Sequence, residues 1–399
     1  MIRSLFLATF AFVALAGAPA AVAQQTPSAQ PAAPKPAQNE TPPAQPRPDA
    51  QAKPAPQKNE VQLEQVAELK EGPGNIAVAG RRVILSMPPF YSPTLRVVEV
   101  KPDGSLVPFP NDAWARAPEK DSPDAVGTNK VLGIRADARG VVWMLDHGGQ
   151  VPKVVGWDTR KNKLHKVIPL PPPVTTPTSF HNDLAVDTVH DALFIADVGG
   201  GTNPAIVVVD MKTGQARRVL ENDASVRHED VPLVVEGKPV RRKNPDGTVT
   251  EPRLGINPIA IDPVGQWVYY GAMHGTSLHR VRTTDLLNAK LTPEQLSARV
   301  ERYGDKPVSD GIIVGNDGNV FITDITANAI GVTSKDGKYR RIVQDERLSW
   351  PDGLAIGSDG KVYVTVNRLH RSAALNAGQN ESQPPYYVFR FAQPRAARR

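Results

Sequence analysis

From about residue 61 to residue 391, short apolar segments alternate with tight turns that contain Asp and Gly. Each unit consists of an apolar strand, such a turn, and a second strand rich in aromatic and β-branched residues. An apolar run of strand length followed by an Asp/Gly turn is typical of a β-hairpin. The clearest copies cover residues 133–146, 257–270, 310–324 and 352–365, and two less regular copies begin at Asn182 and Gly74.

The copies recur along the chain at the spacing of propeller blades. Their first apolar positions are Ile76, Ile134, Leu184, Ile259, Ile312 and Leu354. Successive positions lie 42 to 75 residues apart, about one four-stranded blade each, and the longest interval holds an insertion. The pattern predicts an all-β fold, a six-bladed β-propeller of four-stranded blades. The alternative, two separate β-sandwiches, is disfavoured because the repeat runs through the whole region without a linker.

The sequence also predicts how the ring of blades closes. The segment from Val61 to Leu69 precedes the first copy and is expected to add a strand to the last blade, beside residues 386–391. This N-terminal strand would leave no exposed sheet edge in that blade. Segments with helical periodicity are scarce, and the best of them are residues 284–287 and 292–299.

The first residues predict export. Arg3, an apolar run over residues 5–16 and the small residues 21–23 form the pattern of a secretory signal peptide that is cleaved before Gln24. The apolar run is shorter than the roughly 20 residues that a membrane-spanning helix needs. The protein is therefore expected in the periplasm or the extracellular space, with no transmembrane span after signal cleavage.

The composition changes after the signal peptide. The next segment consists mainly of Ala, Pro, Gln and Lys, and it has too few large apolar residues to offset the entropy of ordering. The predicted organisation is a signal peptide over residues 1–23, a disordered Pro/Ala-rich tether over 24–60, the six-bladed propeller over 61–392 and a basic tail over 393–399.

Composition excludes several classes of chemistry. The chain has no cysteine, so it has no disulfide, thiolate metal site or cysteine nucleophile. Much of the net charge of +6 comes from short runs of Arg and Lys without interleaved aromatic residues, which argues against a nucleic-acid partner. The motifs of serine-hydrolase elbows, zinc peptidases, P-loops and dinucleotide sites are also absent from the sequence.

Several stretches resemble the yellow/major royal jelly protein family. Residues 267–282 (WVYYGAMHGTSLHRVR) are similar to the central signature of that family. Other similar stretches are 195–218 for its third blade, 309–312 with 319–330 for its fifth, and 350–353 with 366–369 for its sixth. The resemblance implies a secreted six-bladed propeller with a ligand cavity in its central channel. Members of this family bind biogenic amines or sterols, or are linked to dopachrome conversion, so the resemblance implies a fold and a pocket rather than one reaction.

The candidate site consists of the polar residues that precede the first strand of each copy. In a propeller the innermost strands line the channel, so side chains at their starts meet at its mouth although they are distant in sequence. These positions hold Asn75, His181, Asn182, Asp183, Asn257, Ser309, Asp310, Trp350 and Asp352. A few convergent polar groups in a concavity are the usual form of a small-molecule site.

One interpretation of these residues is a metal site. The proposed ligands of Ca²⁺ or another divalent cation are Asn182, Asn257, Asp310 and Asp352. Lactonases with six-bladed propellers use such an arrangement. In that case the candidate catalytic residues are Asp310, as a general base, and His181, as a proton carrier near neutral pH.

The other interpretation is direct binding of an organic molecule, with no cofactor. The candidate ligand-binding residues are Asn182, Asn257, Met273, His274, Asp310, Trp350, Asp352 and Asn367. Each Asp or Asn alone is also of the type that caps a turn by binding backbone N–H groups. The sequence favours a propeller that binds a small polar or aromatic molecule. The alternatives are a gluconolactonase-like, metal-dependent lactone hydrolase, a dopachrome-type isomerase and a protein-binding platform. Whether the protein is an enzyme, and its oligomeric state, do not follow from the sequence.

Overall fold

The computed structural model describes residues 58–120, 122, 125–244 and 246–394. The predicted signal peptide, most of the predicted tether and most of the basic tail lie outside the described residues, so these assignments and the export of the protein stay predictions. In the part of the chain that is described, no helix is long and apolar enough to cross a membrane.

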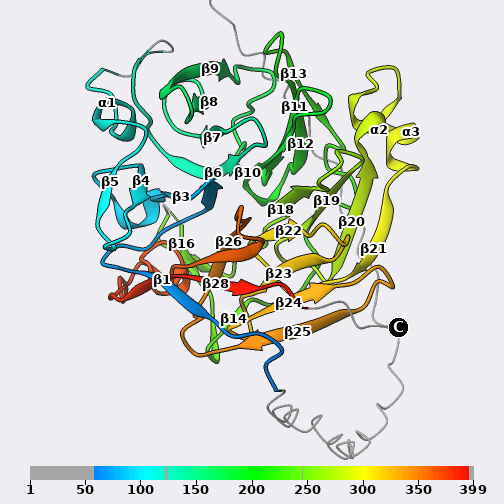
Figure 1. Ribbon diagram of the computed structural model, residues 1–399. Helices are drawn as coiled ribbons and strands as arrows, with labels where there is room; N and C mark the ends of the chain where they lie inside the picture. Colours follow the sequence, from blue (N-terminus) through cyan, green and yellow to red (C-terminus); the bar gives the residue numbers. More distant parts are fainter. Residues whose placement is uncertain (1–57, 121, 123–124, 245, 395–399) are drawn as a thin grey trace, which may run out of the picture. The chain divides into compact units, whose positions relative to one another are not determined.

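The described residues form six four-stranded antiparallel sheets, which are the blades of a propeller (Figure 1). The six-bladed all-β fold predicted from the repeats is confirmed. Blade 1 contains β2 (Ile76–Ala79), β3 (Arg82–Ser86), β4 (Val97–Val100) and β5 (Leu106–Pro108). Blade 2 contains β6 (Val131–Ala136), β7 (Val141–Asp146), β8 (Lys153–Asp158) and β9 (Lys163–Pro169). Blade 3 contains β10 (His181–Asp187), β11 (Ala192–Asp197), β12 (Ala205–Asp210) and β13 (Ala216–Val219).

The remaining blades follow the same order from the channel outward. Blade 4 contains β18 (Ile256–Ile261), β19 (Trp267–Ala272), β20 (Ser277–Arg282) and β21 (Glu301–Asp305). Blade 5 contains β22 (Ile312–Val314), β23 (Val320–Asp324), β24 (Ala329–Thr333) and β25 (Tyr339–Gln344). Blade 6 contains β26 (Pro351–Ile356), β27 (Lys361–Val366), β28 (Tyr386–Ala392) and β1 (Glu64–Leu69). Short helices lie between strands: α1 (Asp112–Ala115), α2 (Thr283–Leu287), α3 (Pro293–Ser297), η1 (Pro89–Tyr91), η2 (Gly199–Gly201) and η3 (Leu369–Arg371).

The N-terminal strand closes the ring, as the sequence predicted. Strand β1 pairs antiparallel with β28, with Glu64 opposite Arg390 and Leu69 opposite Tyr386. The blue strand β1 lies beside the red strand β28 in Figure 1. The chain runs directly from β1, which is hydrogen-bonded into blade 6, to β2, the first strand of blade 1. The first and last blades are therefore joined, and β28 has no free edge.

Six apolar clusters of the core lie between neighbouring blades, one for each neighbouring pair. Successive side chains of a strand point to opposite faces of its sheet, so each blade contributes to the cluster on either side. Large side chains such as Phe194, Phe321 and Phe389 are fully buried. Burying one such side chain contributes roughly 1.5–3 kcal/mol, so a chain without disulfides can be stable by packing alone.

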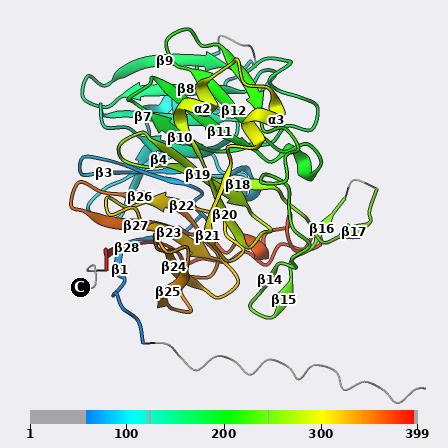
Figure 2. The ribbon, with the colours of Figure 1, turned by 90° about the vertical axis from the view of Figure 1, so that its right-hand side faces the viewer.

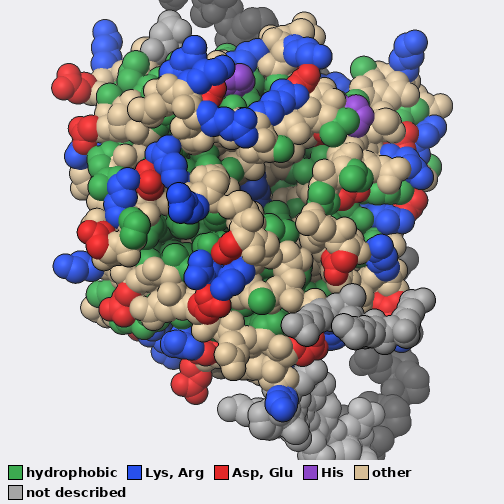
Figure 3. All heavy atoms as spheres, viewed as in Figure 1, with side chains coloured by type: hydrophobic (Ala, Val, Ile, Leu, Met, Phe, Trp, Pro, Cys, Tyr) green, Lys and Arg blue, Asp and Glu red, His purple; other side chains and the backbone are tan. Residues whose placement is uncertain are grey.

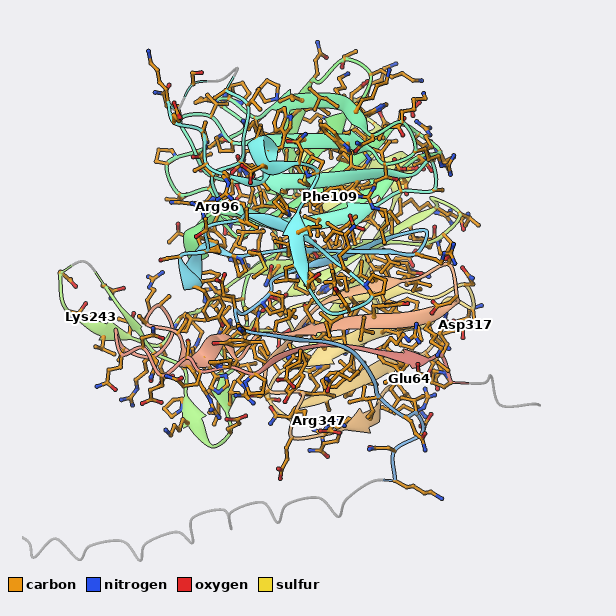
Figure 4. The ribbon with its side chains drawn as sticks, turned by 60° about the vertical axis from the view of Figure 1, so that its left-hand side comes forward. Glu64, Arg96, Phe109, Lys243, Asp317 and Arg347 are labelled. Carbon is orange, nitrogen blue, oxygen red and sulfur yellow. The ribbon has the colours of Figure 1, made fainter. Side chains whose placement is uncertain are left out.

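The long interval between the repeats of blades 3 and 4 forms two hairpins. They are β14 (Val234–Val235) with β15 (Lys238–Pro239), and β16 (Arg242–Lys243) with β17 (Val249–Thr250). Both project from one face of the propeller in Figure 2, and Figure 4 shows Lys243 on this side and Asp317 on the opposite side. The Arg241 backbone N–H donates to the Leu375 carbonyl at 3.2 Å, which joins the insertion to the loop between β27 and β28.

Candidate functional site

A cavity of about 220 Å³ occupies the central channel on the side of the insertion. The predicted site residues that line it are Asn182, Asn257, Met273, Asp310, Trp350, Asp352 and Asn367. The structure thus brings together side chains from blades 3, 4, 5 and 6, and Asn75 of blade 1 joins them. We call the following polar residues the cavity floor: Asn75, Asn182, Asp183, Asn257, Asp310, Asp352 and Asn367.

A chain of hydrogen bonds runs across the floor. The Asn182 amide donates to Asn257 Oδ1, and the Asn257 amide donates to Asp310 Oδ1. Trp350 Nε1 donates to Asp310 Oδ2 at 2.7 Å, and Asn367 Nδ2 donates to Asp352 Oδ2, also at 2.7 Å. The side chains that donate to Asp310 and Asp352 in these hydrogen bonds are all neutral. Neither carboxylate is paired with a positively charged side chain in them.

Burial and mutual repulsion make the floor carboxyl groups unusually weak acids. Burial raises the pKa of Asp310 to about 6, although the bonds from Trp350 and Asn257 oppose the rise. Burial and the neighbouring Asp310 raise the pKa of Asp352 well above its usual range. Burial also raises the pKa of Asp183, and the Arg135 guanidinium opposes that rise. Perturbed carboxyl groups that meet in one cavity are typical of functional sites.

Apolar groups form the walls and the mouth of the cavity. Several come from the blades, including Phe90, Leu132 and Phe180, and others come from the insertion and the β27–β28 loop, including Leu254 and Leu375. The basic residue Arg242 of β16 also lines the mouth. The cavity therefore combines apolar walls with an acidic polar floor.

Trp350 holds an unusual backbone conformation at the edge of the floor. Its φ of 58° lies in the left-handed region, which is costly for a bulky side chain. Its indole ring is fully buried and stacks on His370, with ring centroids 5.9 Å apart. This conformation points the indole N–H at Asp310, so the backbone strain coincides with a specific contact of the site.

The structure does not bring His181 and His274 to the cavity. Asn182 lines the cavity, whereas the buried His181 ring lies near Asp197, with 3.7 Å between Nε2 and Oδ2. His274 Nδ1 accepts a hydrogen bond from the Leu254 backbone at 3.1 Å, and burial lowers its pKa to about 4. A proton-carrying role for either histidine has no supporting contact with the floor residues among those described.

Arg135, which was not among the predicted site residues, contacts the floor residue Asp183. It lies on β6, and its guanidinium forms an ion pair with Asp183, with 2.8 Å between Nη2 and Oδ2. A signal was present in the repeat: the equivalent position is alanine in four of the other five copies, Ala77, Ala185, Ala260 and Ala355. A charged residue at an inner-strand position that holds alanine or isoleucine in the other copies indicates a buried partner.

The floor is compatible with a hard cation only if amide oxygens take part. Within the described residues, no group of three or more His, Cys, Asp or Glu side chains is placed to hold a metal ion. The predicted ligand set contains two carboxylates, Asp310 and Asp352, and the amides of Asn182 and Asn257. Oxygen ligands of these two kinds suit Ca²⁺, so the residue chemistry fits such an ion.

Glycines let the inner strands approach closely beside the floor. A Cβ atom on Gly311 would lie 2.0 Å from the Asp352 carbonyl oxygen, and one on Gly353 would lie 2.6 Å from Asn75 Cα. Replacing Gly311 with alanine must push these strands apart, because backbone atoms cannot yield as a flexible side chain does.

We expect Gly311→Ala to lower the free energy of unfolding by about 2–3 kcal/mol in urea denaturation, since overpacking costs about this much. The matched control is Gly275→Ala, whose added Cβ would meet its nearest neighbour, the Ala272 Cβ, at 3.2 Å. Equal urea midpoints for the two variants would show that the inner strands are not closely packed at Gly311.

Residues 130–391 match the family model described as major royal jelly protein. The chain belongs to the major royal jelly protein family. The matched region runs from the start of blade 2 to the end of β28, so it includes most of the cavity floor. A search of curated proteins gave no significant match.

Solved propellers resemble this family member in fold. A gluconolactonase from Xanthomonas campestris superposes with a TM-score of 0.52 at 12% identity, covering 83% of this chain and 90% of its own. A luciferin-regenerating enzyme superposes with a TM-score of 0.51 at 11% identity, covering 83% of this chain and 95% of its own. At such identities the similarity shows a shared fold and carries no activity over.

Proposed function

We propose that this major royal jelly family member binds a small molecule with an apolar or aromatic body and a positively charged head group. The observation that carries the proposal is the combination of apolar walls with a floor on which Asp310 and Asp352 have only neutral hydrogen-bond donors. The proposal includes export of the protein, which rests on the signal-peptide pattern of residues 1–23.

The floor favours a cationic ligand because the buried carboxylates of Asp310 and Asp352 are costly without a positive partner. A carboxylate removed from water is costly unless it is paired, and one without a cationic partner tends to take up a proton. A cationic head group that hydrogen-bonds Asp310 or Asp352 would remove this cost. An anionic head group would add a like charge to the floor and should be excluded.

The walls favour an apolar or aromatic body. Phe90 and Phe180 can pack against an aromatic ring, and Leu254 and Leu375 bury its other surface. Ligand sites that bury most of a small molecule usually combine such walls with a few polar groups that fix its orientation.

The proposal is tested by calorimetric titration with three compounds of the same shape: 2-phenylethylamine, 2-phenylethanol and phenylacetate. We expect the amine to bind at least about tenfold more tightly than the alcohol, because a charged hydrogen bond to a buried carboxylate is about twice as strong as a neutral one. Phenylacetate should not bind. Because the pKa of Asp310 is about 6, the affinity for the amine should rise between pH 5 and pH 7.5 as this carboxyl group ionises.

A second candidate is a metal-dependent lactone hydrolase. It is favoured by one observation, the side-chain contacts that join Asn182, Asn257 and Asp310 from three successive blades. In this case Ca²⁺ would raise the melting temperature, a chelator would reverse the rise, and the protein would consume a sugar lactone. That outcome, with equal binding of amine and alcohol, would replace the first proposal by the second.

A further inference from the structure

The turn between β14 and β15 holds a glutamate in a conformation that is rare for this residue type. Glu236 has a φ of 52°, and the next residue, Gly237, has a φ of 80°. A two-residue hairpin turn with positive φ at both positions usually contains Asn or Asp followed by Gly. Glutamate carries a steric cost at such a position, and strain of this kind is typical of residues whose side chain has a specific task.

The Glu236 carboxylate receives four polar groups from the loops of blades 5 and 6. Its Oε1 accepts hydrogen bonds from Ser349 Oγ at 2.6 Å and from Asn328 Nδ2 at 3.3 Å. Its Oε2 accepts from Arg371 Nη2 at 2.7 Å and lies 3.3 Å from His370 Nε2. Burial opposes ionisation, but the hydrogen bonds from Ser349 and Arg371 outweigh it and lower the pKa of Glu236 to about 2. One charged side chain therefore anchors the insertion to two blades.

Two of these partners adjoin Trp350. Ser349 precedes Trp350 in the chain, and the His370 ring stacks on the indole with an interplanar angle of 9°. Trp350 has a left-handed backbone, and its indole N–H donates to Asp310 on the cavity floor. A short path of contacts thus leads from Glu236 to the cavity.

Apolar residues of the insertion pack on the same tryptophan. Leu233, Val235 and Val240 are buried in one cluster with Trp350 and Leu369. This cluster is separate from the six clusters between the blades and belongs to the face from which the insertion projects (Figure 2). The opposite face, viewed in Figure 3, is hollowed at the centre of the ring. The insertion therefore supports Trp350 from one side of the channel.

We propose that Glu236 is a positioning residue for the ligand cavity, because it keeps the Trp350 indole N–H directed at Asp310. Without its contacts, the Trp350 backbone would leave the left-handed region, which is costly for a bulky side chain. The indole would then no longer hold the Asp310 carboxylate in one orientation, and a ligand would have to order this group on binding. The inference rests on the proposed function, because it concerns the preparation of the same cavity for the proposed ligand.

The first measurement is the hydrogen exchange of the Trp350 indole N–H, followed by NMR with isotope-labelled tryptophan. The chain has five tryptophans, and the signal that disappears in Trp350→Phe is the one of interest. We expect this proton to exchange at least about tenfold faster in Glu236→Ala than in the natural protein, because local opening around the indole becomes easier. Glu236→Gln retains an acceptor for the Ser349 hydroxyl and should stay within about threefold of the natural protein.

The second measurement is the affinity for 2-phenylethylamine, determined by calorimetric titration. Glu236→Ala should bind the amine at least about fivefold more weakly, since ordering of the site then opposes binding. The matched control is Asp230→Ala, which removes another acidic side chain of the insertion. Asp230 pairs with Arg253 at 3.2 Å, and its side chain is 95% exposed. The control should keep the indole exchange and the amine affinity of the natural protein.

If Glu236→Ala does not fold, Ser349→Ala carries the test, because it removes the hydroxyl that joins Glu236 to the residue before Trp350. It should speed the indole exchange at least about threefold. Unchanged exchange in the folded variants, equal acceleration in Asp230→Ala, or unchanged affinity for an amine that the natural protein binds overturns the role of Glu236. Failure of the proposed function is distinguishable, because it appears as equal binding of 2-phenylethylamine and 2-phenylethanol by the natural protein, whereas indole exchange is measured without ligand.

Discussion

Asp310→Asn is expected to stabilise the protein at pH 7.5 by about 3 kcal/mol and to weaken 2-phenylethylamine binding at least about 100-fold. The first effect follows from the pKa of Asp310, which burial raises from 3.8 to about 6. Each pKa unit corresponds to about 1.4 kcal/mol, so the ionised carboxylate destabilises the folded state by roughly that total. The second effect follows because the head group of the amine loses a buried charged partner.

An asparagine at this position can keep the existing contacts. Its side-chain oxygen accepts from Trp350 Nε1, and its amide donates to Asn257 once the amides of Asn257 and Asn182 have both turned over. The substitution therefore removes the charge without leaving an unpaired buried donor, which is why we expect a net gain.

The stability difference between Asp310→Asn and the natural protein should depend on pH. The folded state holds the Asp310 proton up to about pH 6, whereas the unfolded chain releases it near pH 3.8, so the folded state binds more protons between these values. The stability of the natural protein relative to Asp310→Asn must fall as pH rises through this window. The advantage of the variant should be complete by about pH 7 and absent near pH 4. Buried His147 and His274, whose pKa values burial lowers to about 4, act equally on both proteins and cancel in the comparison.

Urea denaturation between pH 4 and pH 7.5 measures this difference. The matched control is Asp317→Asn, on an exposed turn of the same blade (Figure 4), which should change the stability by less than about 0.5 kcal/mol. A variant at Asp310 that is less stable than the natural protein at pH 7.5 would show that the carboxylate is stabilised by its surroundings.

A stability cost at the floor supports a binding role. Nothing in the packing of the blades requires two carboxyl groups with neutral partners at the channel centre, and asparagine would satisfy the same donors. The left-handed backbone of Trp350, which aims its indole at Asp310, adds a second local cost. Binding of the proposed cationic ligand would offset these costs, because a ligand stabilises the state to which it binds.

The blades were predictable because each hairpin is local in sequence. The Asp/Gly turns and apolar runs of residues 310–324 and 352–365 specify two paired strands without reference to the rest of the chain. The closing strand β1 was predictable for another reason: the last blade has three strands of its own, and residues 61–69 were the remaining apolar segment near the start of the propeller.

The lining of the cavity was predictable only in part, because β-bulges lie where the inner strands begin. In β10 the pairing register shifts between His181 and Asp183. A bulge changes the alternation of side chains, so Asn182 and Asp183 both reach the cavity while His181 does not. Similar register shifts occur in β18 and β26, beside Asn257 and Asp352. Simple alternation cannot tell which of three successive polar residues faces the channel.

The contacts of Arg135 could not be predicted from the sequence of any single strand. Its partners Asn75, Leu184 and Leu354 are far apart in sequence and meet only when the ring closes. The insertion poses the same difficulty, since Leu254 reaches the cavity mouth along a path that no repeat specifies.

Deleting the chain through Leu69 is expected to lower the melting temperature by about 10 °C or more and to cause aggregation. The deletion removes β1, in which Ala67 and Leu69 are buried, and it exposes the backbone edge of β28. The lost burial and strand pairing amount to about 5 kcal/mol, and each kcal/mol shifts the melting temperature of a large domain by about 2 °C or more. The free edge of β28 would offer unpaired N–H and C=O groups to other molecules.

The matched control is a chain that begins at Lys58, which keeps β1 and the hydrogen bond from the Glu60 backbone to the Ile342 carbonyl. Calorimetry and light scattering compare the two truncations at equal concentration. The control should melt like the full chain, because every described contact of the propeller is retained. Equal melting of the two truncations would mean that three strands suffice for blade 6. The ring would then be held by the apolar clusters between blades alone, and the pairing of β1 with β28 would be dispensable for closure.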